Sequence, residues 1–219
     1  MYKAVLFDVD GTLLDTLEDL ADSMNEALRR LGHPTHPIEP YRYYVGDGVE
    51  TLARRALPPT ARDSETVAKC VALMREEYGK RWANKTAPYD GIPDLLDALT
   101  ARRVPMAVLS NKPDEMTKLI VARLLRRWRF ALVVGARPRV PKKPDPTVAV
   151  EIARGLGHPP WEVVYLGDTN TDMQTACAAG MYAVGALWGF RTAEELRASG
   201  ARMLIKKPME LLTLFETDP

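Results

Sequence analysis

Five short apolar runs, separated by segments of helical character, limit the folds open to this 219-residue chain more than any other feature. Each run is apolar throughout, which is typical of strands buried on both faces of a sheet. The runs are Ala4–Phe7, Met106–Leu109, Ala131–Val134, Val163–Leu166 and Tyr182–Leu187. The helices predicted between the later runs are Asp94–Arg103, Asp114–Arg127, Thr147–Leu156 and Asp172–Ala179. The alternation predicts an α/β fold with a doubly wound, parallel, Rossmann-like sheet.

Residues 15 to about 85 do not follow this alternation. Apolar side chains recur there at helical spacing in three stretches, at 17–31, 49–56 and 67–78. Asp15 with Glu18 three residues later is predicted to form a capping box at the start of the first helix. We therefore expect a helical domain at residues 15–85, inserted into an α/β core made of residues 1–14 and 86–219.

Composition excludes several functional classes. The 30 basic and 29 acidic side chains nearly cancel, whereas a nucleic-acid-binding protein usually has a basic excess. No apolar stretch approaches the roughly 18–20 residues of a membrane span, so no membrane partner is expected. Because the first strand is predicted to begin at about Tyr2, no signal peptide is expected. Cys70 and Cys177 have no metal or redox spacing and are expected as small core residues, so we expect a cytoplasmic protein.

Four polar clusters follow or approach the predicted strands. They are Asp8–Thr12, Ser110–Lys112, Lys142–Pro146 and Gly167–Asp172. Each alone is compatible with an ordinary turn or helix cap. Together they indicate a ligand site, because open α/β sheets bind ligands at the carboxyl ends of their strands.

The residue types in these clusters indicate phosphoryl chemistry. Asp8, Asp10 and Asp168 would repel one another at one edge unless a cation lay among them, and hard oxygen ligands suit Mg²⁺. Ser110, Lys143 and the backbone amides of the Asp-Gly-Thr turn could bind phosphate oxygens. A carboxylate can form a covalent phosphoryl intermediate. Asp8, at the strand tip, is thus the expected nucleophile, and Asp10 the acid that protonates the leaving group.

The clusters, in this order, resemble the four motifs of the haloacid dehalogenase superfamily, in which a C1 cap is inserted between the first two motifs. Within it, four segments are similar to the phosphoglycolate phosphatase branch. They are Pro88–Gly91, Val108–Pro113, Pro141–Pro146 and Trp188–Arg191. The Val134–Arg139 stretch departs from the branch, which often has Gly-Gly-Asp there, whereas this chain carries Arg137 and Arg139.

The resemblance implies a role for each matching residue. Asp8 would be nucleophile and Mg²⁺ ligand, Asp10 would be acid/base and bind the metal through its carbonyl, and Asp168 would complete the ligand set. Lys143 would act in catalysis. Asp172 would either support the metal ligands without binding the metal itself or orient that lysine. Three side chains would position phosphate: Thr12, Ser110 and Asn111. Four residues are expected to affect substrate specificity: Gly46, Asp47, Gly48 and Arg191.

We therefore expect a Mg²⁺-dependent phosphomonoesterase that acts on a small phosphorylated metabolite, with 2-phosphoglycolate as the leading candidate. The protein is expected to be a monomer or homodimer. A phosphosugar mutase or an inorganic pyrophosphatase could use the same core acids. A phosphoacceptor signalling domain, a different class of protein, also pairs acids at strand ends.

Overall fold

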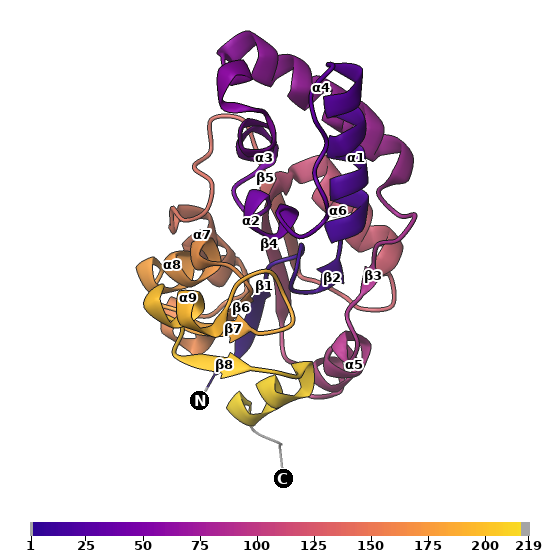
Figure 1. The fold of residues 1–219 in the computed structure, drawn as a ribbon. Coiled ribbons are helices and arrows are strands. Elements are labelled where there is room, and N and C mark those ends of the chain that lie inside the picture. The colour runs from indigo at the N-terminus through magenta and orange to yellow at the C-terminus, as the bar shows by residue number, and fades with distance from the viewer. Residues whose placement is uncertain (1, 216–219) are drawn as a thin grey trace. The chain divides into compact units, whose positions relative to one another are not determined.

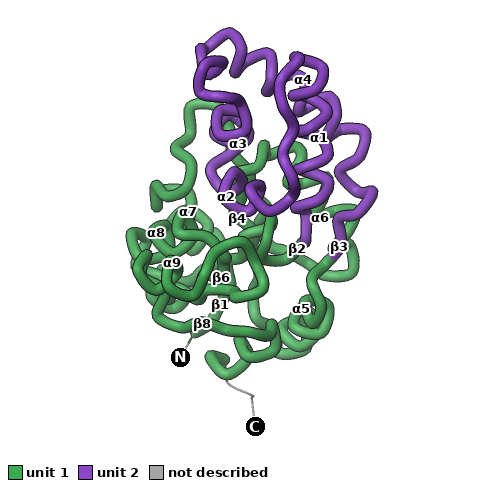
Figure 2. Tube along the Cα trace, viewed as in Figure 1, with its two compact units in different colours: residues 1–14, 88–219 green, residues 15–87 purple. Residues whose placement is uncertain are grey.

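The computed structural model describes residues 2–215 (Figure 1). The chain divides into two compact units (Figure 2). One unit contains Met1–Leu14 and Pro88–Pro219, and the other contains Asp15–Ala87. The second crossing between the units, at residues 87 and 88, lies two residues beyond the boundary expected from the sequence. In the described part of the chain, no helix is both long and apolar enough to cross a membrane.

The larger unit is built on a six-stranded sheet, ordered β5-β4-β1-β6-β7-β8. Every neighbouring pair in this sheet is parallel, which confirms the expected fold class. The strands are β1 (Ala4–Phe7), β4 (Met106–Pro113), β5 (Leu132–Ala136), β6 (Val163–Gly167), β7 (Tyr182–Ala186) and β8 (Met203–Ile205). The sequence interpretation missed β8, because this edge strand is short and only its last residue is buried.

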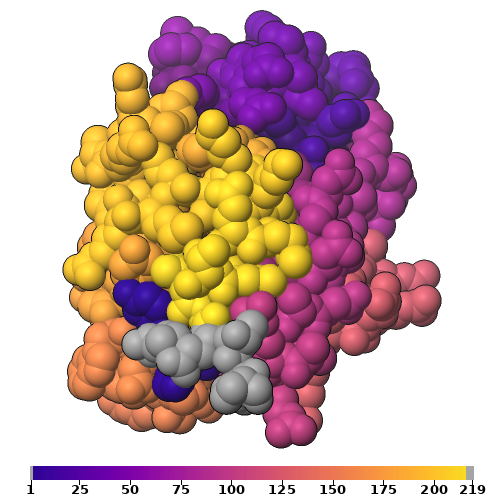
Figure 3. Space-filling model, turned by 90° about the horizontal axis from the view of Figure 1, so that it is seen from below, coloured from indigo at the N-terminus to yellow at the C-terminus, as the bar shows by residue number. Residues whose placement is uncertain are grey.

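Helices follow the strands of this unit. They are α5 (Ile92–Ala101), α6 (Asp114–Leu124), α7 (Thr147–Gly155), α8 (Asn170–Ala178) and α9 (Ala193–Ala198). Two short 3-10 helices, η2 (Pro160–Glu162) and η3 (Pro208–Leu214), complete the unit. The C-terminal segment, yellow in Figure 3, lies beside the segment that holds α5. There, Arg102 Nη1 donates a hydrogen bond to the Leu212 carbonyl at 3.3 Å.

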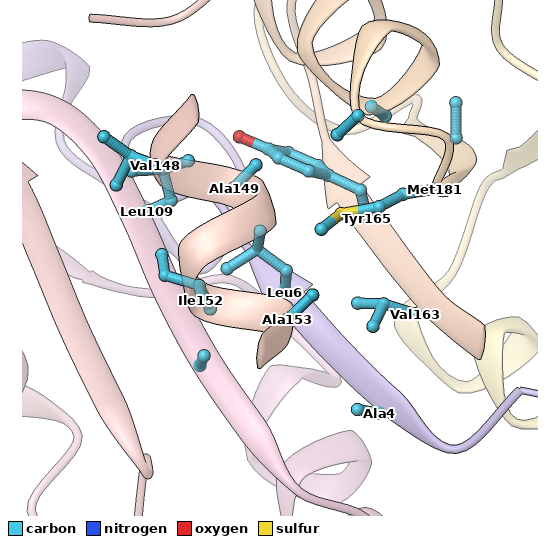
Figure 4. Packing of buried hydrophobic residues seen from close by; sticks show 14 of the residues in the cluster. Ala4, Leu6, Leu109, Val148, Ala149, Ile152, Ala153, Val163, Tyr165 and Met181 are labelled. Carbon is cyan, nitrogen blue, oxygen red and sulfur yellow. The ribbon is translucent and has the colours of Figure 1, made fainter. Parts of the chain in front are cut away.

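The core explains why β1 is apolar throughout. All four residues of β1 are inaccessible to solvent, because both faces of the sheet are covered. On one face, Leu6 lies with Ala149 and Ile152 of α7 and the ring of Tyr165 (Figure 4). Burying one such aliphatic side chain contributes roughly 1.5–3 kcal/mol.

Strand register aligns the ends of the central strands. Phe7 pairs with Val108 of β4 on one side and with Leu166 of β6 on the other. The residues that follow these pairs therefore emerge at one edge of the sheet. This is the edge that carries Asp8, Ser110 and Asp168.

The smaller unit contains the expected helices and two further short ones. Its elements are α1 (Leu17–Arg30), α2 (Tyr41–Tyr44), α3 (Val49–Ala56), η1 (Pro59–Ala61) and α4 (Ser64–Arg81). Helices α1 and α4 pack together, with Arg30 Nη1 2.8 Å from Glu77 Oε1. The two chain crossings, β2 (Leu14–Asp15) and β3 (Ala87–Pro88), form a two-stranded sheet.

Two local expectations are wrong. The capping box fails because Asp15 is the last residue of β2, and it accepts a hydrogen bond from Leu17 N, at 3.3 Å, within the turn before the helix. The Glu18 carboxylate instead pairs with Lys85 Nζ at 2.9 Å. Cys70 is a core residue as expected, but Cys177 is exposed on α8.

Candidate active site

Asp8 directly follows β1, and the sheet fixes its backbone. Its amide donates a hydrogen bond to the Leu166 carbonyl at 3.0 Å, and the residue is almost fully buried. The chain then turns through Gly11, whose φ of 84° favours glycine. The turn follows both acids, Asp8 at the strand tip and Asp10 two residues further along the chain.

Lys143 links two of the carboxylates. Its Nζ lies 2.9 Å from Asp8 Oδ1 and 2.6 Å from Asp172 Oδ1. The lysine side chain is only 2% exposed, so water screens these charges poorly. Burial opposes the charged form of Lys143, but Asp172 and Asp8 outweigh it and raise the lysine pKa. Lys143 is therefore a buried cation held between two acids.

Asn111 supports Lys143 from β4. Its amide nitrogen donates to the Lys143 carbonyl at 3.1 Å, and its amide oxygen accepts from the Lys143 amide at 3.0 Å. Asn111 was expected to position phosphate, and that role stays a prediction. These hydrogen bonds show that it also holds the backbone of Lys143.

Asp168 lies at the end of β6 with both carboxylate oxygens hydrogen-bonded. Thr12 Oγ1 donates to Oδ1, and the Phe190 amide donates to Oδ2, each at 2.8 Å. Thr12 was expected to position phosphate, which stays a prediction; the structure shows its hydroxyl bonded to Asp168. A Cβ added to Gly189 would lie 2.2 Å from Asp168 Cβ. The Gly189 and Phe190 contacts were missed because nothing local in the sequence signals them.

Asp172 lies in the first turn of α8 and is surrounded by hydrogen-bond donors. Its Oδ2 accepts hydrogen bonds from Asp168 N, Thr169 N and Thr169 Oγ1, in a capping box with Thr169. Its Oδ1 accepts from Lys143 Nζ and, at 3.2 Å, from the Tyr165 hydroxyl. These contacts support a role for Asp172 in positioning Lys143 and the loop after β6.

The carboxylates of Asp8, Asp168 and Asp172 carry more negative charge than the single ammonium group of Lys143 can balance. Ligand oxygens of Asp8, Asp168 and Asp172 lie within 4.8 Å of one another. Burial, and next Asp172, raise the pKa of Asp8 well above its usual range. The same two causes raise the pKa of Asp168 to about 7. A cation among these oxygens would relieve the repulsion, and hard carboxylate ligands fit a divalent metal ion such as Mg²⁺.

Asp10 has a cationic partner that sequence reasoning did not assign. Lys112 Nζ lies 3.0 Å from Asp10 Oδ1, and the two side chains are 5% and 13% exposed. Lys112 belongs to the Ser110–Lys112 cluster, but its residue type alone gave no sign of its partner. Ser110, also buried, accepts a hydrogen bond from the Lys112 amide at 3.2 Å.

The residues expected to affect specificity belong to different units. Gly46, Asp47 and Gly48 lie in the smaller unit, where Asp47 Oδ2 pairs with Arg55 Nη2 at 2.6 Å. Arg191 belongs to the larger unit and is nearly buried. Its Nε donates to Asn170 Oδ1 at 3.2 Å, and its charge opposes the rise in the Asp168 pKa.

The stretch Val134–Arg139, which departs from the pattern of the phosphoglycolate phosphatase branch, borders this site. A small hollow is lined by Ser110, Arg137, Lys142 and Lys143, among other residues. The Gly135 amide donates to Asp114 Oδ1 at 2.8 Å, which fixes the end of β5 before Arg137. Arg137 therefore adds positive charge close to the phosphate-binding candidates.

The sheet and its acidic edge match one class of enzyme. The chain belongs to the haloacid dehalogenase-like hydrolase family, whose model matches residues 5–186, and this confirms the expected family. It is 31% identical over 214 residues to a phosphoglycolate phosphatase of Aquifex aeolicus, covering 98% of this chain and 97% of the relative. A phosphoglycolate phosphatase of Pseudomonas putida is 30% identical, with 96% of this chain and 78% of the relative covered.

Solved structures have the same fold. A protein from Lactobacillus delbrueckii subsp. bulgaricus superimposes with a TM-score of 0.91 at 29% identity, and 99% of each chain is covered. A haloacid dehalogenase-like hydrolase from Streptococcus pneumoniae gives a TM-score of 0.87 at 23% identity, covering 98% of this chain and 99% of that one.

Proposed function

We propose that this hydrolase cleaves 2-phosphoglycolate to glycolate and inorganic phosphate through a phosphoryl group carried by Asp8, with Mg²⁺ as cofactor. The observation that carries the proposal is the position of Lys143 between Asp8 and Asp172, beside Asp168. The substrate is supported by the names of relatives about 30% identical over nearly the whole chain.

In the first step, an Asp8 carboxylate oxygen attacks phosphorus and the ester P–O bond breaks. Lys143 holds the carboxylate at Oδ1, and its charge favours the approach of an anionic phosphate. Asp10, two residues on, donates its proton to the ester oxygen, which departs as the alcohol. The first step leaves the phosphoryl group on Asp8 and Asp10 as a carboxylate.

In the second step, Asp10 takes a proton from water as the water oxygen attacks phosphorus. The bond between phosphorus and Asp8 breaks, which frees phosphate and regenerates both acids. Ser110, a buried residue of β4, would hydrogen-bond phosphate oxygens through its hydroxyl.

The residues that would hold Mg²⁺ are Asp8, the Asp10 carbonyl and Asp168. When bound, Mg²⁺ would neutralise charge on the phosphate and fix its orientation. Asp172 is better suited to its hydrogen bonds with Lys143 and Thr169 than to binding metal directly.

The testing experiment measures phosphate release from a panel of small phosphate esters, with Mg²⁺ and with EDTA. The panel includes 2-phosphoglycolate, a hexose phosphate and pyrophosphate, and Asp8→Asn is the control. We expect Mg²⁺-dependent release, fastest from 2-phosphoglycolate, and a loss of at least about 10³-fold in Asp8→Asn, or roughly 4 kcal/mol in barrier.

Each alternative predicts a different result. Faster release from pyrophosphate or another ester would contradict the proposed substrate, and conversion of a sugar phosphate without phosphate release would indicate a mutase. A phosphorylated protein that does not turn over would indicate a phosphoacceptor domain. Near-normal rates in Asp8→Asn would remove Asp8 from the mechanism.

A further inference from the structure

We infer that Tyr165 is a positioning residue for the hydrolysis: its hydroxyl and its ring fix the Lys143 ammonium beside Asp8, the attacking carboxylate. The inference rests on the proposed function, in which Asp8 accepts the phosphoryl group. It gives a role in the reaction to a residue that the sequence interpretation treated only as part of an apolar strand.

Tyr165 brings a hydroxyl into an otherwise apolar part of the core. The residue is inaccessible to solvent, and its ring packs in the same cluster as Leu6 and Ala149 (Figure 4). A buried hydroxyl is costly unless it forms a hydrogen bond. If packing alone mattered here, a phenylalanine would fill this position of β6 at a lower cost. The position therefore indicates a use for the hydroxyl.

The Tyr165 hydroxyl donates to the same oxygen of Asp172 that holds Lys143. The distance from the hydroxyl to Asp172 Oδ1 is 3.2 Å, and Lys143 Nζ lies 2.6 Å from that oxygen. The other carboxylate oxygen, Oδ2, is occupied by donors from Asp168 and Thr169. Burial raises the pKa of Tyr165 well above its usual range, so the phenol keeps its proton and remains a donor. Within residues 2–215, Oδ1 is therefore shared by two donors, Lys143 and Tyr165.

The ring of Tyr165 lies beside the ammonium itself. Lys143 Nζ is 5.9 Å from the ring centroid, within the range of a cation–π interaction. Its other neighbours are Asp8 Oδ1 at 2.9 Å, Asp172 Oδ1 at 2.6 Å and the Leu109 carbonyl at 3.2 Å. These three acceptors match the three N–H groups of an ammonium. Tyr165 is thus a neighbour both of the ammonium and of one of its acceptors.

The exact position of Lys143 matters because two carboxylates compete for its charge. Nζ lies closer to Asp172 than to Asp8. A second donor on Asp172 Oδ1 shares the negative charge of that oxygen and weakens its attraction for the ammonium. Without the hydroxyl, we expect Lys143 to move toward Asp172 and away from the carboxylate that attacks phosphorus. Such a movement would weaken the stabilisation of the transition state, which depends on charges already held in place.

The test is Tyr165→Phe, which removes the hydroxyl and keeps the ring. Asp172 retains its other donors, so the variant should fold, and urea unfolding checks this. On the ester that the wild type hydrolyses best, we expect kcat to fall by about 3–10-fold, as for one lost hydrogen bond, and KM to change by less than about 2-fold. A purely structural role would lower stability and leave kcat of the folded enzyme unchanged. The matched control is Tyr182→Phe, at the start of the neighbouring strand β7, which should leave kcat unchanged.

A double-mutant cycle tests whether Tyr165 acts through Lys143. The substrate is p-nitrophenyl phosphate, whose good leaving group helps to keep slow variants measurable. In the Lys143→Met background, adding Tyr165→Phe should reduce kcat by less than about 2-fold, because no ammonium remains to be positioned.

Three results would overturn the inference and leave the phosphatase proposal intact. They are an unchanged kcat in Tyr165→Phe, a loss that appears in KM alone, and the same fold-loss from Tyr165→Phe with and without Lys143. If Lys143→Met has no measurable activity, the first two results decide. Phosphate release from no ester by the wild type would overturn both proposals.

Discussion

Asp168→Asn should stabilise the metal-free protein at alkaline pH, even though it removes an expected metal ligand. Burial and the neighbouring Asp172 raise the Asp168 pKa from 3.8 to about 7. The folded state therefore keeps a proton that the unfolded chain releases. The stability from this proton is fully present below pH 3.8 and is lost as the pH rises to about 7.

The magnitude follows from that pKa. Each pH unit between 5 and the folded-state pKa of about 7 costs about 1.4 kcal/mol, so the wild type loses about 3 kcal/mol from this group between pH 5 and pH 8. Asparagine does not titrate, and its single carbonyl oxygen leaves Thr12 or the Phe190 amide without an acceptor, at a cost of about 1–3 kcal/mol. That cost is nearly independent of pH.

The assay is urea unfolding with EDTA present, at pH 5 and pH 8, followed by circular dichroism. Relative to wild type, the free energy of unfolding of Asp168→Asn should increase by about 3 kcal/mol between the two pH values. The control is Asp94→Asn, a change on the exposed side of α5. Adding Mg²⁺ at pH 8 should stabilise the wild type more than Asp168→Asn. If the difference in free energy of unfolding between wild type and Asp168→Asn were the same at pH 5 and pH 8, the raised pKa of Asp168 would be refuted.

Three further changes test other parts of the structure. Asp10→Asn should slow hydrolysis of alkyl phosphates more than that of aryl phosphates, which have better leaving groups; equal losses would exclude leaving-group protonation by Asp10. Gly189→Ala should force Asp168 to move and raise the Mg²⁺ concentration for half-maximal activity about 10-fold or more. Gly79→Ala, where a Cβ meets no atom within 4 Å, is its control. Leu6→Ala should lower the free energy of unfolding by about 2–5 kcal/mol, measured in urea; a change below about 1 kcal/mol would contradict its place in the core.

The sequence predicted the sheet well because its central strands are buried on both faces. A run such as Ala4–Phe7 is apolar at every position, and no polar residue interrupts it before Asp8. Strand β8 lacks this signature, since Met203 and Leu204 remain partly exposed at the sheet edge. Its pairing with β7 depends on tertiary contacts that periodicity does not report.

The sequence predicted which acids lie together at the sheet edge, and it predicted their hydrogen-bond partners less well. Strand order alone brings Asp8 and Asp168 to one edge, so their proximity could be inferred. The partners of Thr12, Asn111 and Lys112 could not be inferred. Whether such a side chain contacts phosphate, backbone or a carboxylate depends on the direction in which the side chain points. A hydroxyl or an amide near a phosphate site can equally well orient the residue that binds it.

The pairing of β2 with β3 has a consequence for how enzymes of this kind diversify. The chain leaves the larger unit and returns to it along two adjacent strands. The 73 residues of Asp15–Ala87 are therefore joined to the larger unit through the β2-β3 pair. Such a segment can be lengthened, shortened or exchanged for another without changing the order of the six strands that carry the acids. An exchange at these two crossings would therefore replace the smaller unit and leave Asp8, Asp10 and Asp168 in place. A chimaera that keeps residues 1–14 and 88–219 and takes the intervening segment from a relative would show whether that segment changes the substrate range.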